Sequence, residues 1–459
     1  MCIYIFLLYN GKIKLIFLQI IITVIIMYEK SIWEEYLLKK EFPILRENIK
    51  TDVLVIGGGI AGVLNAYELS SSGFDVVLVD KRKITSGNTK NTTAFVSAHH
   101  ESLYQDILKK HGFNKTKEYL NLNLHSVDEY KKLSEKYDFD FEMVDLTLFS
   151  KDFELINKEY KTLKELGANV YINKEIPFTK DVLGVTIKNQ AIINPIKLIN
   201  EIVNDGQNSK LKVFEKSEVT KIVGNTAILK NGSKIFFNNV IICTHYPILN
   251  KLNLMFMKLT QTRSYVLVIK KDKINGTFCS LDEKGYYFRT YKDYLIIGGN
   301  DRDTKDLCIT SFKEDICKLY NIKEKDIEYS WSGQDCITID EMPYIGRFNF
   351  FYPNRYLVTG FNFWGFTWSM ASTKIIKDLI ENKKFNNIVS PNRFFIRPKL
   401  FQNFFNSFKN LITFKTPRCS HLGCKLNYNE IEKVWECPCH GSRYTTFGEV
   451  IEGPAKKNI

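Results

Sequence analysis

The stretch TDVLVIGGGIAG at residues 51–62 decides the fold. Its first half is an apolar, β-branched run that is typical of a buried strand, and closely spaced glycines follow it. Gly57 permits a tight turn, Gly59 lets the backbone approach a pyrophosphate, and Gly62 allows a helix to pack closely on the strand. The stretch therefore predicts a strand, a turn and a helix whose N-terminus faces phosphate groups.

A second apolar run at residues 76–79 ends in Asp80. Strand, glycines, helix, second strand and terminal acid in this order indicate a dinucleotide-binding βαβ unit, in which Asp80 accepts hydrogen bonds from the adenosine ribose. An ordinary glycine-rich turn is the alternative. Ala66 and Gly73 extend the spacing after Gly62, which favours FAD over NAD. A single fingerprint also favours an organic substrate, rather than NAD(P)H, as the electron donor.

Two short clusters near the C-terminus combine cysteine and histidine. They read CSHLGC at residues 419–424 and CPCHGS at residues 437–442. A Rieske [2Fe-2S] cluster has two thiolates on one iron and two imidazoles on the other, so both residue types are needed on two loops. A tetrahedral zinc site and a plain disulfide knot are the alternatives, and each leaves part of the pattern unused.

Residues 418–454 resemble the cluster-binding part of Rieske proteins, particularly the high-potential kind in quinol-oxidising cytochrome complexes. The resemblance implies two ligands for each iron, namely Cys419 and Cys437 on one and His421 and His440 on the other. The segment before the first loop is short, so we expect a module with fewer supporting strands than its relatives.

The same resemblance gives roles to four further residues. It implies that Cys424 and Cys439 form a disulfide between the two loops. It also implies that Ser442 and Tyr444 donate hydrogen bonds to the cluster sulfurs, which stabilises the reduced state and raises the potential.

Residues 51–382 resemble the D-amino-acid-oxidase-like family of FAD-dependent oxidoreductases. Besides the fingerprint, the resemblance rests on SGNTKNTTA at 86–94, IICTHYP at 241–247 and VTGFNFWG at 358–365. With the C-terminal clusters, the chain is similar to a bacterial subgroup that joins this flavoenzyme to a Rieske module. The fold implied is an α/β Rossmann-like FAD-binding domain with an inserted, mainly antiparallel β substrate domain, plus a small all-β Rieske cluster-binding module.

The family resemblance also implies which residues contact FAD. These are Gly57, Gly59, Gly62 and Asp80 on the ADP half, Val219 on the adenine, Thr92, Thr93 and Ala94 beside the flavin, and Gly360 and Gly365 near the isoalloxazine ring. For Gly360 and Gly365 alone, a role as helix C-caps is the alternative.

Catalytic groups leave a weaker trace in the sequence. His100 and His245 are candidates for proton handling, although a lone histidine is more often a satisfied core residue. A second group alternates along expected strands and comprises Arg263, Tyr265, Tyr287 and Arg289. An arginine of this group could clamp a substrate carboxylate, and a solvated strand face is the alternative.

We expect four segments along the 459 residues. They are an apolar extension at 1–26, an FAD-dependent oxidoreductase domain at 27–392 with an inserted sheet at about 145–345, a linker with an amphipathic Phe-rich helix at 393–417, and the Rieske module at 418–459. The extension is interpreted as translation upstream of a true start at Met27, with a membrane anchor as the alternative. The Phe-rich helix is expected to pack on its own protein, with a membrane surface as the alternative.

Composition limits the partners of the protein. The formal charge of +13 comes from lysines spread along the whole chain. Because no nucleic-acid motif accompanies them, we expect no binding to nucleic acid. Cysteines outside the cluster loops show no pairing pattern, which is typical of a reducing compartment. We therefore expect a cytoplasmic protein, with membrane association through the N-terminal segment as the alternative.

The sequence as a whole predicts an enzyme. It would oxidise a small amine, amino acid or hydroxy acid at FAD and pass the electrons through a Rieske [2Fe-2S] cluster to an unidentified acceptor, a protein or a quinone. One alternative is an electron-transfer or redox-sensing flavo-iron–sulfur protein without its own organic substrate. Another is an ordinary oxidase that uses oxygen and carries a vestigial cluster domain.

Overall fold

The computed structural model describes residues 30–101, 103–205, 210–249, 254–271, 273–283, 285–303, 309–383, 388–393, 417–430 and 432–459. The expected extension at 1–26 and the Phe-rich segment between residues 393 and 417 therefore lie outside the described residues. Within the described part of the chain, no helix has the length and apolar character that crossing a membrane requires.

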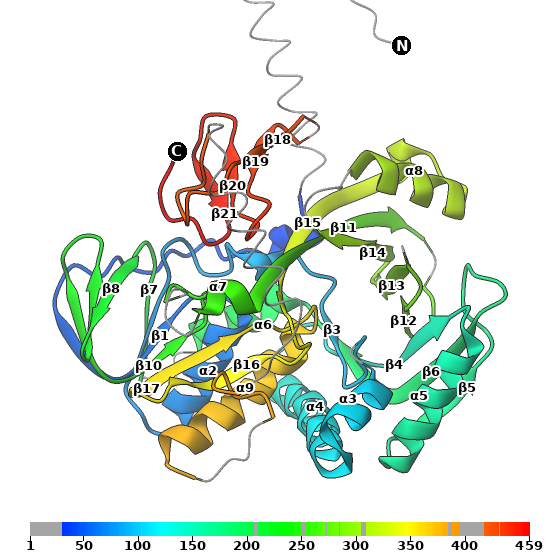
Figure 1. The fold of residues 1–459 in the computed structure, drawn as a ribbon, viewed down its shortest axis with the longest axis horizontal. Helices are drawn as coiled ribbons and strands as arrows, with labels where there is room; N and C mark the ends of the chain where they lie inside the picture. The colour runs from blue at the N-terminus through cyan, green and yellow to red at the C-terminus, as the bar shows by residue number, and fades with distance from the viewer. Residues whose placement is uncertain are drawn as a thin grey trace, which may run out of the picture.

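The first sheet carries the dinucleotide-binding unit (Figure 1). Its strand order is β16-β17-β10-β1-β2-β7, and a β8–β9 hairpin pairs onto β10. The strands are β1 (Ile49–Ile56), β2 (Val76–Val79), β7 (Leu211–Phe214), β8 (Val219–Val223), β9 (Thr226–Leu229), β10 (Lys234–Ile242), β16 (Tyr344–Asn349) and β17 (Tyr352–Thr359). The strand β1 pairs in parallel with β2 and β10, and its buried apolar run is what a parallel strand covered on both faces requires.

Helices α2 (Ile60–Ser71) and α9 (Gly365–Ile380) pack together against this sheet. They are joined by a buried hydrogen bond of 2.7 Å from Asn65 Nδ2 to Ser372 Oγ. The other helical segments are η1 (Ile32–Tyr36), η2 (Asn88–Lys90), α3 (Tyr104–His111), α4 (Phe113–Lys136), α5 (Phe153–Glu165), α6 (Pro195–Asn204), α7 (Met255–Lys258), α8 (Ile309–Tyr320) and η4 (Glu324–Asp326).

The second sheet has nine strands in the order β15-β11-β14-β13-β12-β4-β6-β3, with β5 paired to β6. Its strands are β3 (Phe95–Val96), β4 (Glu142–Ser150), β5 (Val170–Asn173), β6 (Leu183–Ile192), β11 (Leu259–Lys270), β12 (Thr277–Ser280), β13 (Tyr286–Tyr291), β14 (Tyr294–Asp303) and β15 (Ile327–Thr338). All pairings are antiparallel except that of β12 with β4. The mainly antiparallel sheet is therefore confirmed.

The boundaries of this sheet differ from the expected single span of about 145–345. Its strands come from two stretches, 95–192 and 259–338, because β7 to β10 return to the first sheet between them. The strand β3 and the start of β4 also precede residue 145. A sequence read segment by segment does not reveal such crossovers, because they are set by which strands pair.

The third sheet is small and antiparallel, with the order β18-β19-β20-β21. Its strands are β18 (Asn427–Asn429), β19 (Val434–Glu436), β20 (Arg443–Thr445) and β21 (Val450–Glu452). It belongs to residues 417–459, called the cluster module below. The first cysteine–histidine loop precedes β18, and the second connects β19 to β20. Figure 1 shows this module, in red, lying over β11 and β15 of the second sheet.

Candidate functional site

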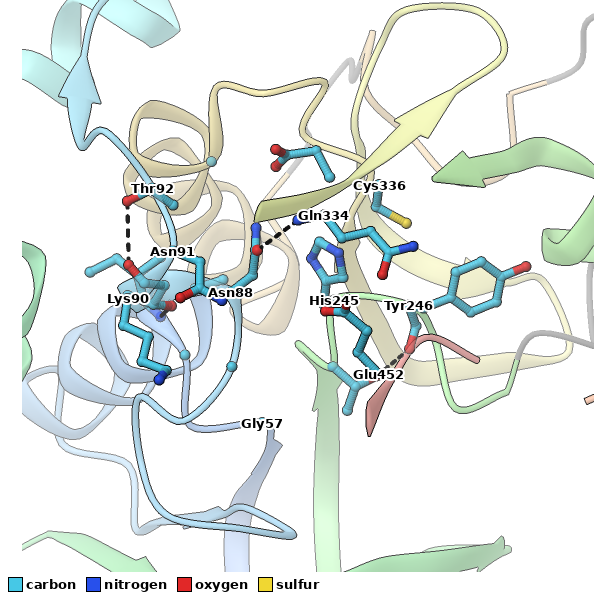
Figure 2. Close-up of a pocket in the computed structure, with 18 of the residues that line it drawn as sticks. Gly57, Asn88, Lys90, Asn91, Thr92, His245, Tyr246, Gln334, Cys336 and Glu452 are labelled. Carbon is cyan, nitrogen blue, oxygen red and sulfur yellow. Dashed lines mark hydrogen bonds between the residues drawn. The ribbon is translucent and has the colours of Figure 1, made fainter. Parts of the chain in front are cut away.

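A cavity of about 800 Å³ is walled by the two large sheets and the cluster module. We call it the cofactor cavity. Figure 2 shows Gly57 and the loop that carries Asn88 to Thr92 on one side, and His245, Gln334 and Glu452 on the other. The cavity therefore connects the glycine fingerprint with the C-terminal module.

Nine of the ten residues expected to contact FAD line this cavity. They are Gly57, Gly59, Asp80, Thr92, Thr93, Ala94, Val219, Gly360 and Gly365. Gly62 lies behind the turn, where a Cβ atom would be 1.8 Å from the carbonyl oxygen of Gly57, so it serves the predicted close packing of α2. Gly360 follows β17 and Gly365 begins α9, so neither caps the C-terminus of a helix.

The fingerprint turn is held in an open form that a phosphate can approach. Gly57 has φ +113° and no space for a Cβ, which would lie 2.4 Å from the carbonyl oxygen of Cys243. Gly59 is the N-cap of α2, so the helix N-terminus points at the cavity. Asp80 accepts hydrogen bonds of 2.7 Å from the backbone N–H groups of Gly58 and Arg82, which fix its carboxylate at the cavity wall.

The loop expected beside the flavin is anchored through its backbone. The indole of Trp33 donates to the carbonyl oxygen of Thr92 at 2.7 Å, and Arg289 donates to that of Ala94 at 2.7 Å. Arg289 is fully buried and also donates to Ile193, and burial lowers its pKa to about 9. Arg289 thus positions the loop and is not available as a clamp for a substrate.

Arg263, the other arginine expected to clamp a substrate carboxylate, is also engaged in ion pairs within the protein. Arg263 of β11 lines the cavity, but it forms ion pairs with Glu432 at 2.9 Å and Glu436 at 3.3 Å, both in the cluster module. Tyr265 donates a hydrogen bond to the same Glu432, whereas Tyr287 lines the cavity. Neither of the two arginines expected to clamp a substrate is therefore free to do so.

His100 does not line the cavity. Its ring stacks on Trp364 with centroids 4.8 Å apart, and its two nitrogens bond to Tyr119 Oη at 2.8 Å and to the carbonyl oxygen of Ser97 at 2.7 Å. Burial lowers its pKa to about 3, so the ring is neutral. His100 is a satisfied core residue that supports Trp364, and this placement does not support the proton-handling role expected of it.

His245 lies in the cavity wall at the end of β10. Its φ of +59° is unusual for a residue with a side chain, and such backbone is found disproportionately at functional sites. Its Nε2 atom is buried with no hydrogen-bond partner among the described residues. Burial lowers the pKa of His245, and the charge of Glu452 opposes this shift. His245 remains a candidate for proton handling.

Two acids that the sequence did not single out also line the cavity. Burial raises the pKa of Glu101 to about 7, and the charge of Asp335 adds to the shift. Burial likewise raises the pKa of Asp335 to about 7. No Lys or Arg within the described part of the chain forms an ion pair with either carboxyl group. No local motif marks them, because they come together only through the fold.

The cluster loops bring the four expected iron ligands together. Cys419 and Cys437 are buried, and the pKa of Cys419 is lowered to about 6, chiefly by a hydrogen bond with Cys437. The rings of His421 and His440 face each other at right angles, with centroids 4.9 Å apart. Nδ1 of His440 is buried and has no hydrogen-bond partner among the described residues, which suits a metal ligand. Two thiols and two imidazoles in this arrangement fit a [2Fe-2S] cluster.

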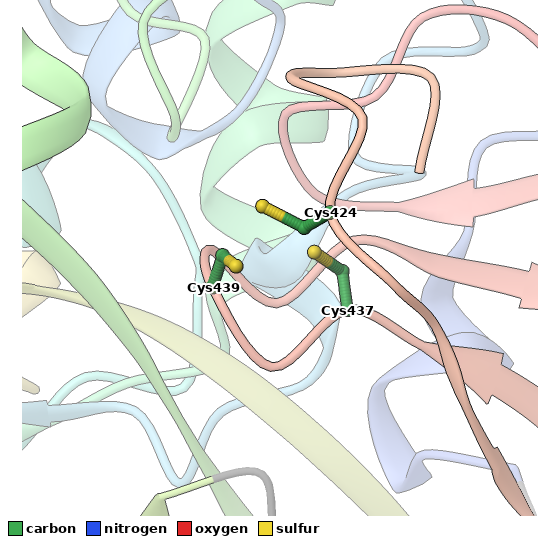
Figure 3. A group of neighbouring side chains, drawn as sticks. All are labelled: Cys424, Cys437 and Cys439. Carbon is green, nitrogen blue, oxygen red and sulfur yellow. The ribbon is translucent and has the colours of Figure 1, made fainter. Parts of the chain in front are cut away.

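The expected sulfur donors lie beside these ligands. Tyr444 Oη donates to Cys419 Sγ at 3.3 Å, and the Ser442 hydroxyl also bonds with this sulfur. The sulfur atoms of Cys424, Cys437 and Cys439 lie within 4.8 Å of one another (Figure 3). Three sulfurs alone would also suit zinc. The disulfide between Cys424 and Cys439 stays a prediction, and the loops already bring its two sulfurs close together.

Tyr246 connects the two halves of the site. It follows β10 and lines the cofactor cavity, and its ring lies edge-on to both cluster histidines, with centroids 5.9 Å from His421 and 6.5 Å from His440. Gln334 Nε2 of β15 donates to the carbonyl oxygen of Gly441 at 2.8 Å. The module is therefore docked on the cavity wall with its cluster loops facing inward.

Comparisons with known proteins agree with this geometry. The family model "FAD dependent oxidoreductase" matches residues 52–379, and the model "Rieske [2Fe-2S] domain" matches residues 405–459. A putative Rieske 2Fe-2S iron-sulfur protein of Bacillus subtilis, YhfW, is 28% identical over 480 residues, which cover 91% of this chain and 94% of that protein.

Two further similarities each concern one part of the chain. The cytochrome b6-f complex iron-sulfur subunit 1 of Nostoc sp. is 49% identical over 41 residues, which cover 9% of this chain and 23% of that protein. The crystal structure of glycine oxidase from Geobacillus kaustophilus aligns with a TM-score of 0.64 at 17% identity, covering 76% of this chain and all of that one. The two family models confirm FAD and the [2Fe-2S] cluster, and with the structural likeness they confirm the expected fold class. The chain belongs to the family of FAD-dependent oxidoreductases and carries a Rieske [2Fe-2S] domain at its C-terminus.

Proposed function

We propose that this protein oxidises a small amine, amino acid or hydroxy acid at FAD and delivers the electrons through its own cluster to a separate acceptor, a protein or a quinone. The observation that carries the proposal is the position of Tyr246. Its side chain forms part of the cofactor cavity and also packs on both cluster histidines. When bound, FAD accepts a hydride from the substrate, and the [2Fe-2S] cluster accepts single electrons.

The walls of the cavity suit a reaction that excludes water. Large aromatic side chains line it, namely Tyr246, Tyr287, Trp331, Phe361, Phe363, Trp364 and Phe366. Residues 450–456 of the cluster module complete the wall. These side chains lower the local dielectric constant, so fixed charges act more strongly on a bound substrate than they would in water.

Among the three substrate classes, the charges in the cavity favour an amine. Arg263 and Arg289 are occupied by acceptors of the protein itself, so they cannot clamp a substrate carboxylate. Glu101 and Asp335 line the cavity without a cationic partner among the described residues. An ammonium group placed between them would stabilise the ionised form of two partly buried carboxyl groups whose pKa values are raised to about 7.

An anaerobic titration tests the proposal. Purified protein containing both cofactors is mixed with primary and secondary amines, amino acids and 2-hydroxy acids, while the flavin absorbance and the EPR signal of the reduced cluster are recorded together. We expect one amine to bleach the flavin and to generate the cluster signal. A variant lacking one iron ligand, Cys437→Ser, is the control in which the flavin should still bleach without an EPR signal. If dithionite reduces both centres but no compound of the panel reduces either, the proposal fails.

A further inference from the structure

The two nitrogens of the His440 ring have different surroundings. Nε2 lies 2.9 Å from the backbone carbonyl oxygen of Phe256, in helix α7 of the oxidoreductase part. Nδ1 is buried and has no partner among the described residues. Since a carbonyl oxygen can only accept, the proton of the neutral ring sits on Nε2 and Nδ1 offers its lone pair. The contact thus sets the tautomer that a ligand to iron needs.

The surroundings leave this contact little freedom. His440 is 3% exposed, and its ring lies edge-on to Phe256 with centroids 6.1 Å apart. The next residue, Gly441, receives the hydrogen bond from Gln334 and has φ +70°. A Cβ at Gly441 would lie 2.3 Å from Gln334 Nε2 and 2.6 Å from Gln261 Oε1. The loop that carries His440 is therefore packed directly on the oxidoreductase part.

Charged groups hold the module in the same position. Arg263 of β11 is joined to Glu432 and Glu436 of the module, and within the module itself Arg443 is joined to Glu436 at 3.2 Å and to Glu452 at 2.8 Å. Lys456 of the module also donates to the carbonyl oxygen of Ile248 at 3.1 Å. The contacts of Arg263 and Lys456 therefore join the module to the oxidoreductase part at two places besides the His440 contact.

We propose that the Phe256 carbonyl is a built-in hydrogen-bond acceptor for the cluster ligand His440, and that this edge of the cluster is closed to outside quinones. Ligand histidines commonly donate their second N–H to a carbonyl oxygen, which fixes the ring and makes the metal-bound nitrogen a stronger donor. The carbonyl oxygens of a quinone can only accept hydrogen bonds, so a quinone that bonds to this ring needs a free imidazole N–H. Here that N–H is already used within the protein, so a quinone has no donor at His440.

The contact also has a consequence for the cluster potential. A stronger nitrogen donor favours the oxidised iron, and exclusion of water disfavours the additional negative charge of the reduced cluster. Both effects lower the potential of the docked module. Weakening the docking should therefore raise the midpoint potential, and it should expose the His440 N–H to a quinone.

The first experiment uses the unaltered protein with both cofactors. The cluster is reduced with dithionite, the excess reductant is removed, and the EPR spectrum is recorded at once with and without saturating 2-hydroxy-1,4-naphthoquinone, a quinone of low potential. We expect identical g-values in the two spectra. A change in g-values on addition of the quinone would overturn the proposal, and this arm requires no variant to fold.

The second experiment compares two neutral substitutions of the same kind. Gln334→Met removes the hydrogen bond to Gly441, and Gln105→Met removes a hydrogen bond of 3.2 Å to the carbonyl oxygen of Leu155, away from the module. We expect Gln334→Met to raise the midpoint potential of the cluster and to make its EPR spectrum respond to the quinone, while Gln105→Met behaves as the unaltered protein. Hydrogen exchange of residues 437–442 reports whether the loop has loosened. A loosened loop with an unchanged potential would overturn the proposal.

Neither experiment contains a substrate. Failure of the proposed function would therefore appear only in the substrate titration. Failure of this inference would appear only in the potential and in the response to the quinone.

Discussion

Arg263 of β11 and Glu432 of the cluster module form an ion pair of 2.9 Å, with their side chains only 4% and 5% exposed. The pair joins the second sheet to the module at the wall of the cofactor cavity. A buried ion pair stabilises a structure little compared with a well-packed apolar pair, but removal of one partner leaves an uncompensated charge. The stability of the docked module therefore depends on this arginine.

We expect Arg263→Met to destabilise the docked module by about 3 kcal/mol, because Glu432 and Glu436 lose one of their two arginine partners in a buried place. Denaturant unfolding followed through the visible circular dichroism of the cluster measures the change. The control is Lys132→Met, which removes an ion pair with Glu129 whose lysine is 64% exposed. Its effect should stay below about 1 kcal/mol. Equal effects in the two variants would contradict the expectation.

Gly62→Ala should reduce FAD binding severely. The added methyl group would lie 1.8 Å from the carbonyl oxygen of Gly57, so either the fingerprint turn or helix α2 must move. Overpacking of this kind costs about 1–3 kcal/mol or more. The flavin-to-protein absorbance ratio after purification measures it. Ser134→Ala in α4 is the control, because its exposed hydroxyl donates only to the carbonyl oxygen of Lys131 and lies outside the cavity. Full flavin content in Gly62→Ala would show that FAD binding does not require this close packing of helix α2 on the Gly57 turn.

Asp335→Asn should weaken the binding of an amine substrate. A hydrogen bond to a charged group contributes about 1.5–3 kcal/mol, which corresponds to a roughly 10- to 150-fold change in the dissociation constant. Because the pKa of Asp335 is raised to about 7, amine binding to the unaltered protein should strengthen as the pH rises through 7 and the carboxyl ionises. Difference absorbance of the flavin, recorded with a non-reacting amine, measures both effects. The pH dependence should become smaller in the variant, where Glu101 alone titrates.

Asp335→Asn should increase the folding stability of the protein, although it weakens the binding of an amine. The folded pKa of Asp335 lies above its ordinary value of 3.8, so the folded state holds more protons than the unfolded state between these values. Stability therefore falls as the pH rises from about 4 to 7, and the loss is complete above pH 7. We expect Asp335→Asn to raise Tm in the flavin-free protein, and by more at pH 8 than at pH 5. A variant that is less stable at pH 8 would show that the carboxylate has a partner in the folded protein.

Tyr444→Phe should lower the midpoint potential of the cluster. The ring is fully buried and phenylalanine fills the same space, but the hydrogen bond of 3.3 Å to Cys419 Sγ is lost. A bond worth about 1 kcal/mol corresponds to roughly 40 mV for one electron. Potentiometric titration followed by EPR measures the shift. Tyr428→Phe serves as the control, because its hydroxyl bonds to Thr446 at 3.3 Å instead of to a ligand.

The sequence predicted the parts of the site that are local in the chain. The turn at Gly57 and the acid at Asp80 belong to one short βαβ unit, and each pair of cluster ligands lies on one loop, so spacing alone identifies them. Glu101 and Asp335 could not be found in this way, because each is a single acid in an ordinary stretch and their closeness depends on the fold. The role of Arg263 could not be predicted for the same reason. The sequence places it on a strand, but its partners Glu432 and Glu436 belong to another domain, so its ion pairs depend on the fold.

The way the two large sheets share the chain governs the order in which the protein can be assembled. The strand β1 is synthesised early, but its neighbour β10 follows only after β3 to β6 of the second sheet, and the outer strands β16 and β17 follow only after the whole of that sheet. The first sheet around the phosphate-binding turn can therefore be completed only after distant parts of the chain have been synthesised. The cluster loops come after all strands of the two large sheets in the chain, so flavin insertion can precede iron–sulfur loading during biogenesis.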